Sequence, residues 1–214
     1  MEVDKNLVKK YLNFKGIDNA FDDFMDEVFL EVKSISNPKK LCVLSDVSKE
    51  NGFYKLNKLG LLLKSEDINS LFTDCESIAT MVVTLGLAVD KKIALYAKTD
   101  MTRSLVMDAV ASVYVESFLD KLEEEVCTQT NLNKTMRFSP GYGDLDIAIQ
   151  KDLIKAVGAD KYLGIMVNSN NLMVPLKSIT AFIGFSTVKQ VFSSICLTCP
   201  QKGNCKTKCS KANI

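Results

Sequence analysis

Histidine is absent from this chain of 214 residues. Its absence excludes a Ser-His-Asp or Cys-His nucleophile within the chain and any imidazole ligand to a metal ion. It also removes the side chain that most often serves as a general base near neutral pH. Any chemistry that this chain supports therefore has to rely on other groups.

Three further features are missing, and each excludes a class of protein. The 27 basic and 26 acidic residues are interleaved and give a formal net charge of +1, so no basic face predicts nucleic-acid binding. The longest apolar run, Ile78 to Val89, contains threonines and a glycine and is too short to span a bilayer. The first six residues lack the apolar core of a signal peptide. We therefore expect a cytoplasmic protein that contacts neither nucleic acid nor membrane.

Helix and strand patterns alternate along the chain but do not follow a regular order of βαβ units. Apolar residues at helical spacing predict helices over 6–14, 18–38, 65–72 and 101–128, and Leu105 is expected in the apolar stripe of the last of these. Short apolar or β-branched runs predict strands over 41–44, 53–56, 59–63 and 77–85. The pattern predicts an α+β domain, with an antiparallel-rich mixed sheet flanked by helices, over residues 1–190 and a C-terminal appendage over 191–214.

The stretch from Arg137 to Tyr142 places a fixed cation and an aromatic side chain on a Pro-Gly turn. Pro140 fixes its own φ, and Gly141 allows a positive φ or a close approach of the backbone to a ligand. The Arg137 guanidinium can bind a carboxylate through two parallel hydrogen bonds, and Tyr142 offers a flat face and a hydroxyl. These groups suit a small zwitterion with a planar ring. The alternative is a surface turn with a solvated arginine and a tyrosine packed on the domain.

The turn from Arg137 to Tyr142 is one of three sequence blocks that occur in a fixed order over about half of the chain. They are the helical run Asp108-Ala-Val-Ala-Ser-Val-Tyr-Val-Glu116-Ser-Phe118, the Arg-x-x-Pro-Gly-Tyr turn, and the strands expected over 164–167, 172–175 and 178–184. On these blocks the segment from about Asp100 to Phe185 resembles the reactivation domain of cobalamin-dependent methionine synthase, which binds S-adenosylmethionine. The N-terminal portion fits that family loosely, and the last twenty residues look like an addition.

The resemblance implies a set of ligand-binding residues. Arg137, Pro140, Gly141 and Tyr142 match the turn of the family's site, and Glu116 matches an acidic position that lines it. An acid is physically reasonable there because the ligand carries sulfonium and ammonium charges that need compensation in a partly dry pocket. A solvated glutamate on the helix surface is the alternative for Glu116.

Other family positions are matched less well. The family uses an N-terminal aspartate for the ligand's amino group, and four residues are candidates here: Asp18, Asp22, Asp23 and Asp26. Asn168-Ser169-Asn170 stands where the family often has Thr-Glu-Ser, so this chain can form a polar turn there but lacks the acid. The aromatic residues that close the family's site are not clearly matched; Phe185 and Phe192 are the nearest, and we do not assign them that role.

The implied function is to bind S-adenosylmethionine and to support reductive methylation of cobalamin on a separate methionine synthase or related corrinoid methyltransferase. Because no histidine can lie beneath the cobalt, the cobalamin is expected on a partner chain. In this family flavodoxin or ferredoxin supplies the electron that reactivation needs. The chain would be an activation subunit that positions the methyl group and excludes water. The alternatives are a non-catalytic S-adenosylmethionine-binding module and a metal-binding redox or scaffold protein centred on the C-terminal cysteines.

Four of the seven cysteines gather in the last twenty residues with the spacing C-x2-C-x5-C-x3-C: Cys196, Cys199, Cys205 and Cys209. A lysine-rich tail too short for a core of its own can be ordered by one tetrahedral metal or cluster. Without histidine, the set suits zinc or an iron–sulfur cluster almost equally. For a cytoplasmic chain, disulfides between these cysteines are less favoured than metal binding. A tail that binds no metal is the remaining alternative. The other cysteines, Cys42, Cys75 and Cys127, are expected to be buried thiols.

Overall fold

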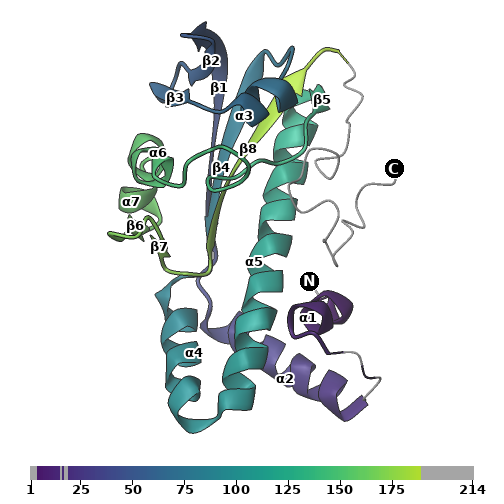
Figure 1. Ribbon diagram of the computed structural model, residues 1–214. Coiled ribbons are helices and arrows are strands. Elements are labelled where there is room, and N and C mark those ends of the chain that lie inside the picture. The colour runs from purple at the N-terminus through teal and green to yellow at the C-terminus, as the bar shows by residue number, and fades with distance from the viewer. Residues whose placement is uncertain (1–3, 15, 17–18, 189–214) are drawn as a thin grey trace.

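The computed structural model describes residues 4–14, 16 and 19–188 and shows a sheet with helices on both faces (Figure 1). The helices are α1 (Lys5–Tyr11), α2 (Asn19–Ile35), α3 (Glu66–Leu71), α4 (Leu87–Thr99), α5 (Met101–Thr130), α6 (Ile149–Val157) and α7 (Ala159–Tyr162). The strands are β1 (Lys39–Glu50), β2 (Phe53–Leu56), β3 (Leu61–Leu63), β4 (Ser77–Thr84), β5 (Asn133–Lys134), β6 (Met166–Val167), β7 (Met173–Val174) and β8 (Ser178–Ser186).

The main sheet has the order β3-β2-β1-β4-β8-β5, and all of these neighbouring pairs are antiparallel. The strand β1 was expected to be short, but it pairs with β4 along its first part and with β2 along its last four residues. A separate hairpin joins β6 and β7. The expected α+β architecture with an antiparallel-rich sheet is therefore confirmed.

The strand β4 forms the centre of the sheet and is buried along all eight residues, as its apolar composition predicts. Alternate side chains of a strand point to opposite faces. Ala79, Met81 and Val83 belong to the hydrophobic cluster that contains α5, whereas Ile78 and Val82 belong to the cluster that contains α6. The sheet thus separates two cores.

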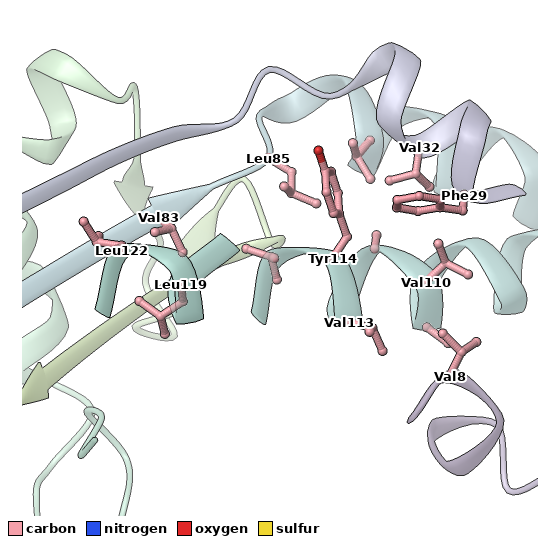
Figure 2. Close-up of a cluster of buried hydrophobic side chains, with 14 of the residues drawn as sticks. Val8, Phe29, Val32, Val83, Leu85, Val110, Val113, Tyr114, Leu119 and Leu122 are labelled. Carbon is pink, nitrogen blue, oxygen red and sulfur yellow. The ribbon is translucent and has the colours of Figure 1, made fainter. Parts of the chain in front are cut away.

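The helix α5 runs along one face of the sheet, and its bounds agree with the helix expected over 101–128. Its N-terminus is capped by Asp100, whose carboxylate accepts a hydrogen bond of 3.0 Å from the backbone N–H of Arg103. Figure 2 shows Val8 of α1 and Phe29 of α2 approaching different sides of the helix. Because several elements pack around α5, its buried residues extend well beyond one stripe, and Leu105, expected within that stripe, is 57% exposed.

Three helices were not expected from the sequence: α4, α6 and α7. The only buried residue of α4 is Val89, so α4 lacks the apolar stripe that identifies an amphipathic helix. In α6 the apolar residues Leu153, Ile154 and Val157 do stand at helical spacing, so this helix could have been predicted from the sequence. Of the three cysteines expected to be buried thiols, Cys75 is buried, but Cys42 and Cys127 are only partly buried.

Within the described part of the chain, none of the helices combines the length and the apolar character that crossing a membrane requires.

Candidate functional site

A cleft of about 260 Å³ lies at the edge of β8, slightly smaller than the usual range for small-molecule sites. It is bordered by α5, by the turn that contains the Pro-Gly pair, by the start of α6 and by the β6–β7 hairpin. Its lining residues are Glu116, Ser139, Pro140, Tyr142, Ile147, Gln150, Asn171, Leu172, Met173, Ser178, Ile179 and Thr180.

The cleft forms where β8 loses its neighbour on one side. Phe138 exchanges two backbone hydrogen bonds with Phe182, of 2.9 and 2.7 Å, and the chain then turns away from the sheet. Backbone hydrogen-bonding groups alternate between the two edges of an antiparallel strand. Since Phe182 directs its N–H and C=O to this edge, Thr180, two residues earlier, directs its own to the cleft.

The expected Pro-Gly turn is present and forms one wall. The N–H of Tyr142 donates to the carbonyl of Ser139 at 3.0 Å, and Gly141 has a φ of +85°. Proline and then a positive-φ glycine at the two central positions is the signature of a type II turn. The Tyr142 ring packs edge-on against Phe138 with 6.0 Å between ring centroids, and the residue is 56% exposed. The turn therefore presents an accessible aromatic face beside the cleft.

The residues after the turn are fixed to the N-terminus of α3. The Asp144 carboxylate accepts hydrogen bonds from the Ser65 hydroxyl and from the backbone N–H of Glu66 at 2.7 Å. Asp67 accepts in return from the N–H of Asp144, and a side chain at Gly143 would collide with that Asp67 carboxylate. Partial loss of solvent acts to raise the pKa of Asp144, but the hydrogen bonds from Ser65 and the backbone outweigh it and leave the pKa lowered.

Arg137 points to the α5 side of the sheet. Its neighbour Phe138 is buried in the cluster on the other face, so strand alternation directs Arg137 toward α5. Its guanidinium lies 2.7 Å from Asp120, 3.2 Å from Glu123 and 3.9 Å from Glu116. Arg137 is not among the residues that line the cleft, and its buried Nη1 has no hydrogen-bond partner. The structure thus places Arg137 behind Glu116 as seen from the cleft, with one guanidinium nitrogen that makes no hydrogen bond.

Glu116 lines the cleft from α5, and its side chain is 39% exposed. Tyr11, at the end of α1, lies near this acid: burial raises the pKa of Tyr11, and the charges of Glu116 and Tyr142 raise it further. Tyr11 is 56% exposed. Because α1 and α5 are distant in sequence, no local pattern indicated that this tyrosine lies close to the site.

The other residues expected at the site lie elsewhere or outside the described part of the chain. Asp22 and Asp26 of α2 pair with lysines of α1, and neither they nor Asp23 line the cleft; Asp18 lies outside the described residues. The expected polar turn is formed by Asn168, whose side chain accepts from two backbone N–H groups at 2.9 and 3.0 Å. Phe185 is buried in the α5 core, and Phe192 is not described.

Four polar residues of the cleft were not singled out from the sequence: Gln150, Asn171, Ser178 and Thr180. The Ser178 hydroxyl donates to the carbonyl of Pro175 at 2.7 Å and lies 2.8 Å from the hydroxyl of Thr84. The Thr180 hydroxyl donates to the Gln150 side-chain oxygen at 3.0 Å. For Ser178 and Thr180 the sequence signal was a polar residue at every second position at the start of β8, which marks one face of that strand.

No group of three or more acidic or cysteine side chains that could hold a metal ion occurs among the residues that the structure describes. The four C-terminal cysteines lie outside that part. In the cleft itself the groups present are a carboxylate, an exposed tyrosine, hydroxyls and two amides. Such a set can bind and orient a ligand that carries positive charge and a flat ring.

The chain matches no protein-family model and no curated protein. Among solved structures it is similar to the crystal structure of the MetH reactivation domain bound to AdoHcy, with a TM-score of 0.60 and 16% sequence identity. The match covers 80% of this chain and 66% of that chain, so this chain spans just under two thirds of the MetH structure. We conclude that the chain has the fold of the MetH reactivation domain.

Proposed function

We propose that this chain binds S-adenosylmethionine in the β8 cleft and supports the reductive methylation of cobalamin on a separate protein. One observation carries the proposal: the chain has the fold of a domain crystallised with AdoHcy, the demethylated form of S-adenosylmethionine. The cleft also brings together Glu116, Pro140 and Tyr142, three residues that the sequence resemblance implied.

The charges around the cleft suit this ligand. Glu116 can compensate the sulfonium or the ammonium group, and its partial burial strengthens the attraction relative to water. The unused Nη1 of Arg137 can donate to the ligand carboxylate, although the pairing with Asp120 and Glu123 means that the arginine must share its charge. Tyr142 supplies an aromatic face in the same cleft as Glu116.

The role of the chain in this reaction is positioning. Reduced cobalamin on the partner accepts the methyl group; the carbon–sulfur bond breaks, its electron pair stays on sulfur, and S-adenosylhomocysteine is released. An external one-electron donor such as flavodoxin or ferredoxin first reduces the cobalt. The side chains of this protein hold the sulfonium, orient its methyl group toward the partner and exclude water. A site without a histidine is sufficient, because no protein nucleophile takes part.

Two measurements test the proposal. Calorimetric titration should show binding of S-adenosylmethionine to the isolated chain, which should transfer no methyl group by itself. Addition of a cobalamin-loaded methionine synthase that lacks its own reactivation domain, with a strong reductant, should restore methylated cobalamin. Absence of binding would reject the site. Methylation of a small acceptor by the isolated chain would instead indicate a conventional methyltransferase.

The C-terminal cysteines need a separate test. We propose that Cys196, Cys199, Cys205 and Cys209 bind zinc or an iron–sulfur cluster. Protein purified without oxygen should then be brown and contain iron and sulfide, with the colour lost in Cys199→Ser, or be colourless and contain one zinc ion. A cluster would be able to pass on the electron that reactivation requires. Protein that contains no metal would reject both assignments.

A further inference from the structure

Gln150 occupies a core position of an amphipathic helix. The buried residues of α6 are Gln150, Leu153, Ile154 and Val157, which lie three or four residues apart on one face. Gln150 is the polar member of this face and is only 3% exposed. Glutamine is mostly found at protein surfaces, so its burial here calls for a physical reason.

The hydrogen bonds of the Gln150 amide are incomplete. Its side-chain oxygen accepts a hydrogen bond of 3.0 Å from the Thr180 hydroxyl. Its side-chain nitrogen is buried and has no hydrogen-bond partner. A buried amide donor without an acceptor is destabilising, and such groups are rare in folded proteins. The residue also lines the cleft, so a ligand could provide the missing acceptor.

The part of the cleft around this amide suits a flat ring. Pro140, Ile147, Leu172 and Met173 contribute apolar side chains to its lining. Glu116, the charged residue of the lining, comes from α5 with Arg137 behind it, whereas Gln150 comes from α6 and Asn171 from the β6–β7 hairpin. The cleft therefore has a charged side toward α5 and a more apolar side that carries two amides.

We propose that Gln150 recognises the adenine base of the ligand, a role that rests on the proposed binding of S-adenosylmethionine in this cleft. The Gln150 nitrogen would donate to N7 of adenine, and the second lone pair of its oxygen would accept from the N6 amino group. This two-bond pairing is the usual way in which a glutamine side chain reads adenine. The ligand carboxylate fits this amide less well, because it has only acceptors and would face the amide oxygen.

Thr180 has a supporting role in this arrangement. Its hydroxyl donates to the amide oxygen and leaves the amide nitrogen to donate to the base. Because the Gln150 nitrogen is buried in this structure, entry of the base requires a neighbouring side chain of the cleft to move aside. Leu172, which is 47% exposed and lines the cleft, has the space to do so.

The first test compares two ligands on the unmodified protein. S-adenosylhomocysteine and its deaminated analogue S-inosylhomocysteine differ only in the base edge, where an oxygen replaces the N6 amino group. An oriented amide cannot satisfy two acceptors at O6 and N7. We therefore expect the inosine analogue to bind about 10- to 100-fold more weakly in a calorimetric titration. Equal affinity for the two ligands would overturn the assignment without the need for any variant.

The second test removes the amide. Gln150→Met keeps the length of the side chain but has neither donor nor acceptor of comparable strength. It should bind S-adenosylhomocysteine about 10-fold or more weakly and should lose the preference for adenine over hypoxanthine. Gln129→Met, at an exposed position near the end of α5, is the matched control and should keep both affinities.

The outcomes separate this inference from the proposed function. If the unmodified protein binds S-adenosylhomocysteine and Gln150→Met retains the base preference, the role of Gln150 is wrong and the proposed function stands. If the unmodified protein does not bind S-adenosylhomocysteine at all, the proposed function fails and the inference fails with it.

Discussion

The two faces of the central strands differ in composition. On the α5 side, β4 from Ala79 to Val83 and β8 from Ile179 to Phe185 present only apolar residues: Ala79, Met81, Val83, Ile179, Ala181, Ile183 and Phe185. On the α6 side, the same strands combine Ile78, Val82 and Phe182 with five buried hydroxyl residues: Thr80, Thr84, Ser178, Thr180 and Ser186. Alternation along two adjacent strands therefore gives one apolar face and one mixed face.

Because of this difference in composition, we expect the α5 side of the sheet to contribute mainly to stability and the α6 side mainly to ligand binding. The apolar face packs against the longest helix and needs no polar partners, so it can be filled closely. The mixed face contains buried hydroxyl groups: Thr180 is bonded to Gln150 and Ser178 to Thr84, whereas the Thr80 hydroxyl has no hydrogen-bond partner. The cleft opens at the edge of the mixed face. Changes on the α5 side should alter stability, and changes around the cleft should mainly alter binding.

The largest effect is expected on the α5 side. Phe29 of α2 is 7% exposed, and its ring packs edge-on against Tyr114 of α5 with 5.5 Å between centroids. Phe29→Ala should lower the free energy of unfolding by about 3–5 kcal/mol through lost burial and a cavity. Denaturant titration measures this loss. Leu30→Ala, at the next position but 64% exposed, is the control and should change the free energy by less than about 0.5 kcal/mol.

The same comparison requires that Phe29→Ala leave ligand binding intact. Calorimetry at a temperature where the variant is folded should give an affinity for S-adenosylhomocysteine within about twofold of the unmodified protein, a difference of only ~0.4 kcal/mol. A large loss of affinity would show that the two sides of the sheet are coupled.

Arg137 tests the charged side of the cleft. If its Nη1 binds the ligand carboxylate, Arg137→Ala should cost about 2–5 kcal/mol of binding, or roughly 30-fold or more in affinity. Arg137→Lys should recover little, because an ammonium group cannot form two parallel hydrogen bonds. Unchanged affinity in both folded variants would show that Arg137 only organises the acids of α5.

A matched control for Arg137 exists at the other end of α5. Arg103 lies 2.7 Å from Glu27 and 3.2 Å from Glu31, so it also joins carboxylates from a neighbouring helix. Arg103→Ala should affect stability in a similar way and leave binding unchanged. A loss of affinity in both variants would indicate a general structural effect.

Local patterns were sufficient for much of the fold. Ser65 and Asp100 cap the helices expected after them, and the β-branched run of β4 is buried as its composition indicates. The long β1 was underestimated because its last part is polar and pairs with β2 at the rim of the sheet. Leu105 was misassigned because the tertiary environment of α5, rather than helical periodicity, decides which of its residues are buried.

The site was predictable only where its residues are neighbours in sequence. The turn from Ser139 to Tyr142 follows from Pro140 and Gly141 alone. The pairing of Arg137 with Asp120 and Glu123, by contrast, depends on how α5 crosses the sheet, which no local pattern specifies. The same holds for Gln150, which meets Thr180 across a separation of thirty residues.

Asp144 tests how firmly the wall of the cleft is held. Asp144→Ala removes the carboxylate that binds Ser65 and Glu66, and it should lower the free energy of unfolding by about 1 kcal/mol, as for a lost helix cap. Because hydrogen bonding lowers the folded-state pKa of Asp144, its contribution is present above the unfolded pKa of about 3.9 and is lost as the pH falls below it. Denaturant titrations at pH 7 and pH 3 should therefore differ less in Asp144→Ala than in the unmodified protein.

A control for this pH effect is Asp152→Ala, at an exposed position on α6. It should keep the pH dependence of the unmodified protein. An unchanged pH dependence in Asp144→Ala would show that the loop is held by its backbone alone.

The smallest effect is expected from Cys42, which reports on the apolar side. Cys42 of β1 packs against the α5 core, and burial raises the pKa of its thiol to about 11. The thiolate is the reactive form, so alkylation at Cys42, mapped by peptide mass spectrometry, should be slow at pH 8 and should accelerate only toward pH 11. Unfolded protein, with a thiol pKa near about 8.5, serves as the reference. The neutral thiol favours the folded state, so its contribution is complete below the unfolded pKa and is lost as the pH rises toward 11. Rapid alkylation of the folded protein at pH 8 would mean that water reaches β1 on the α5 side, and the contrast between the two faces would then be weaker than their composition indicates.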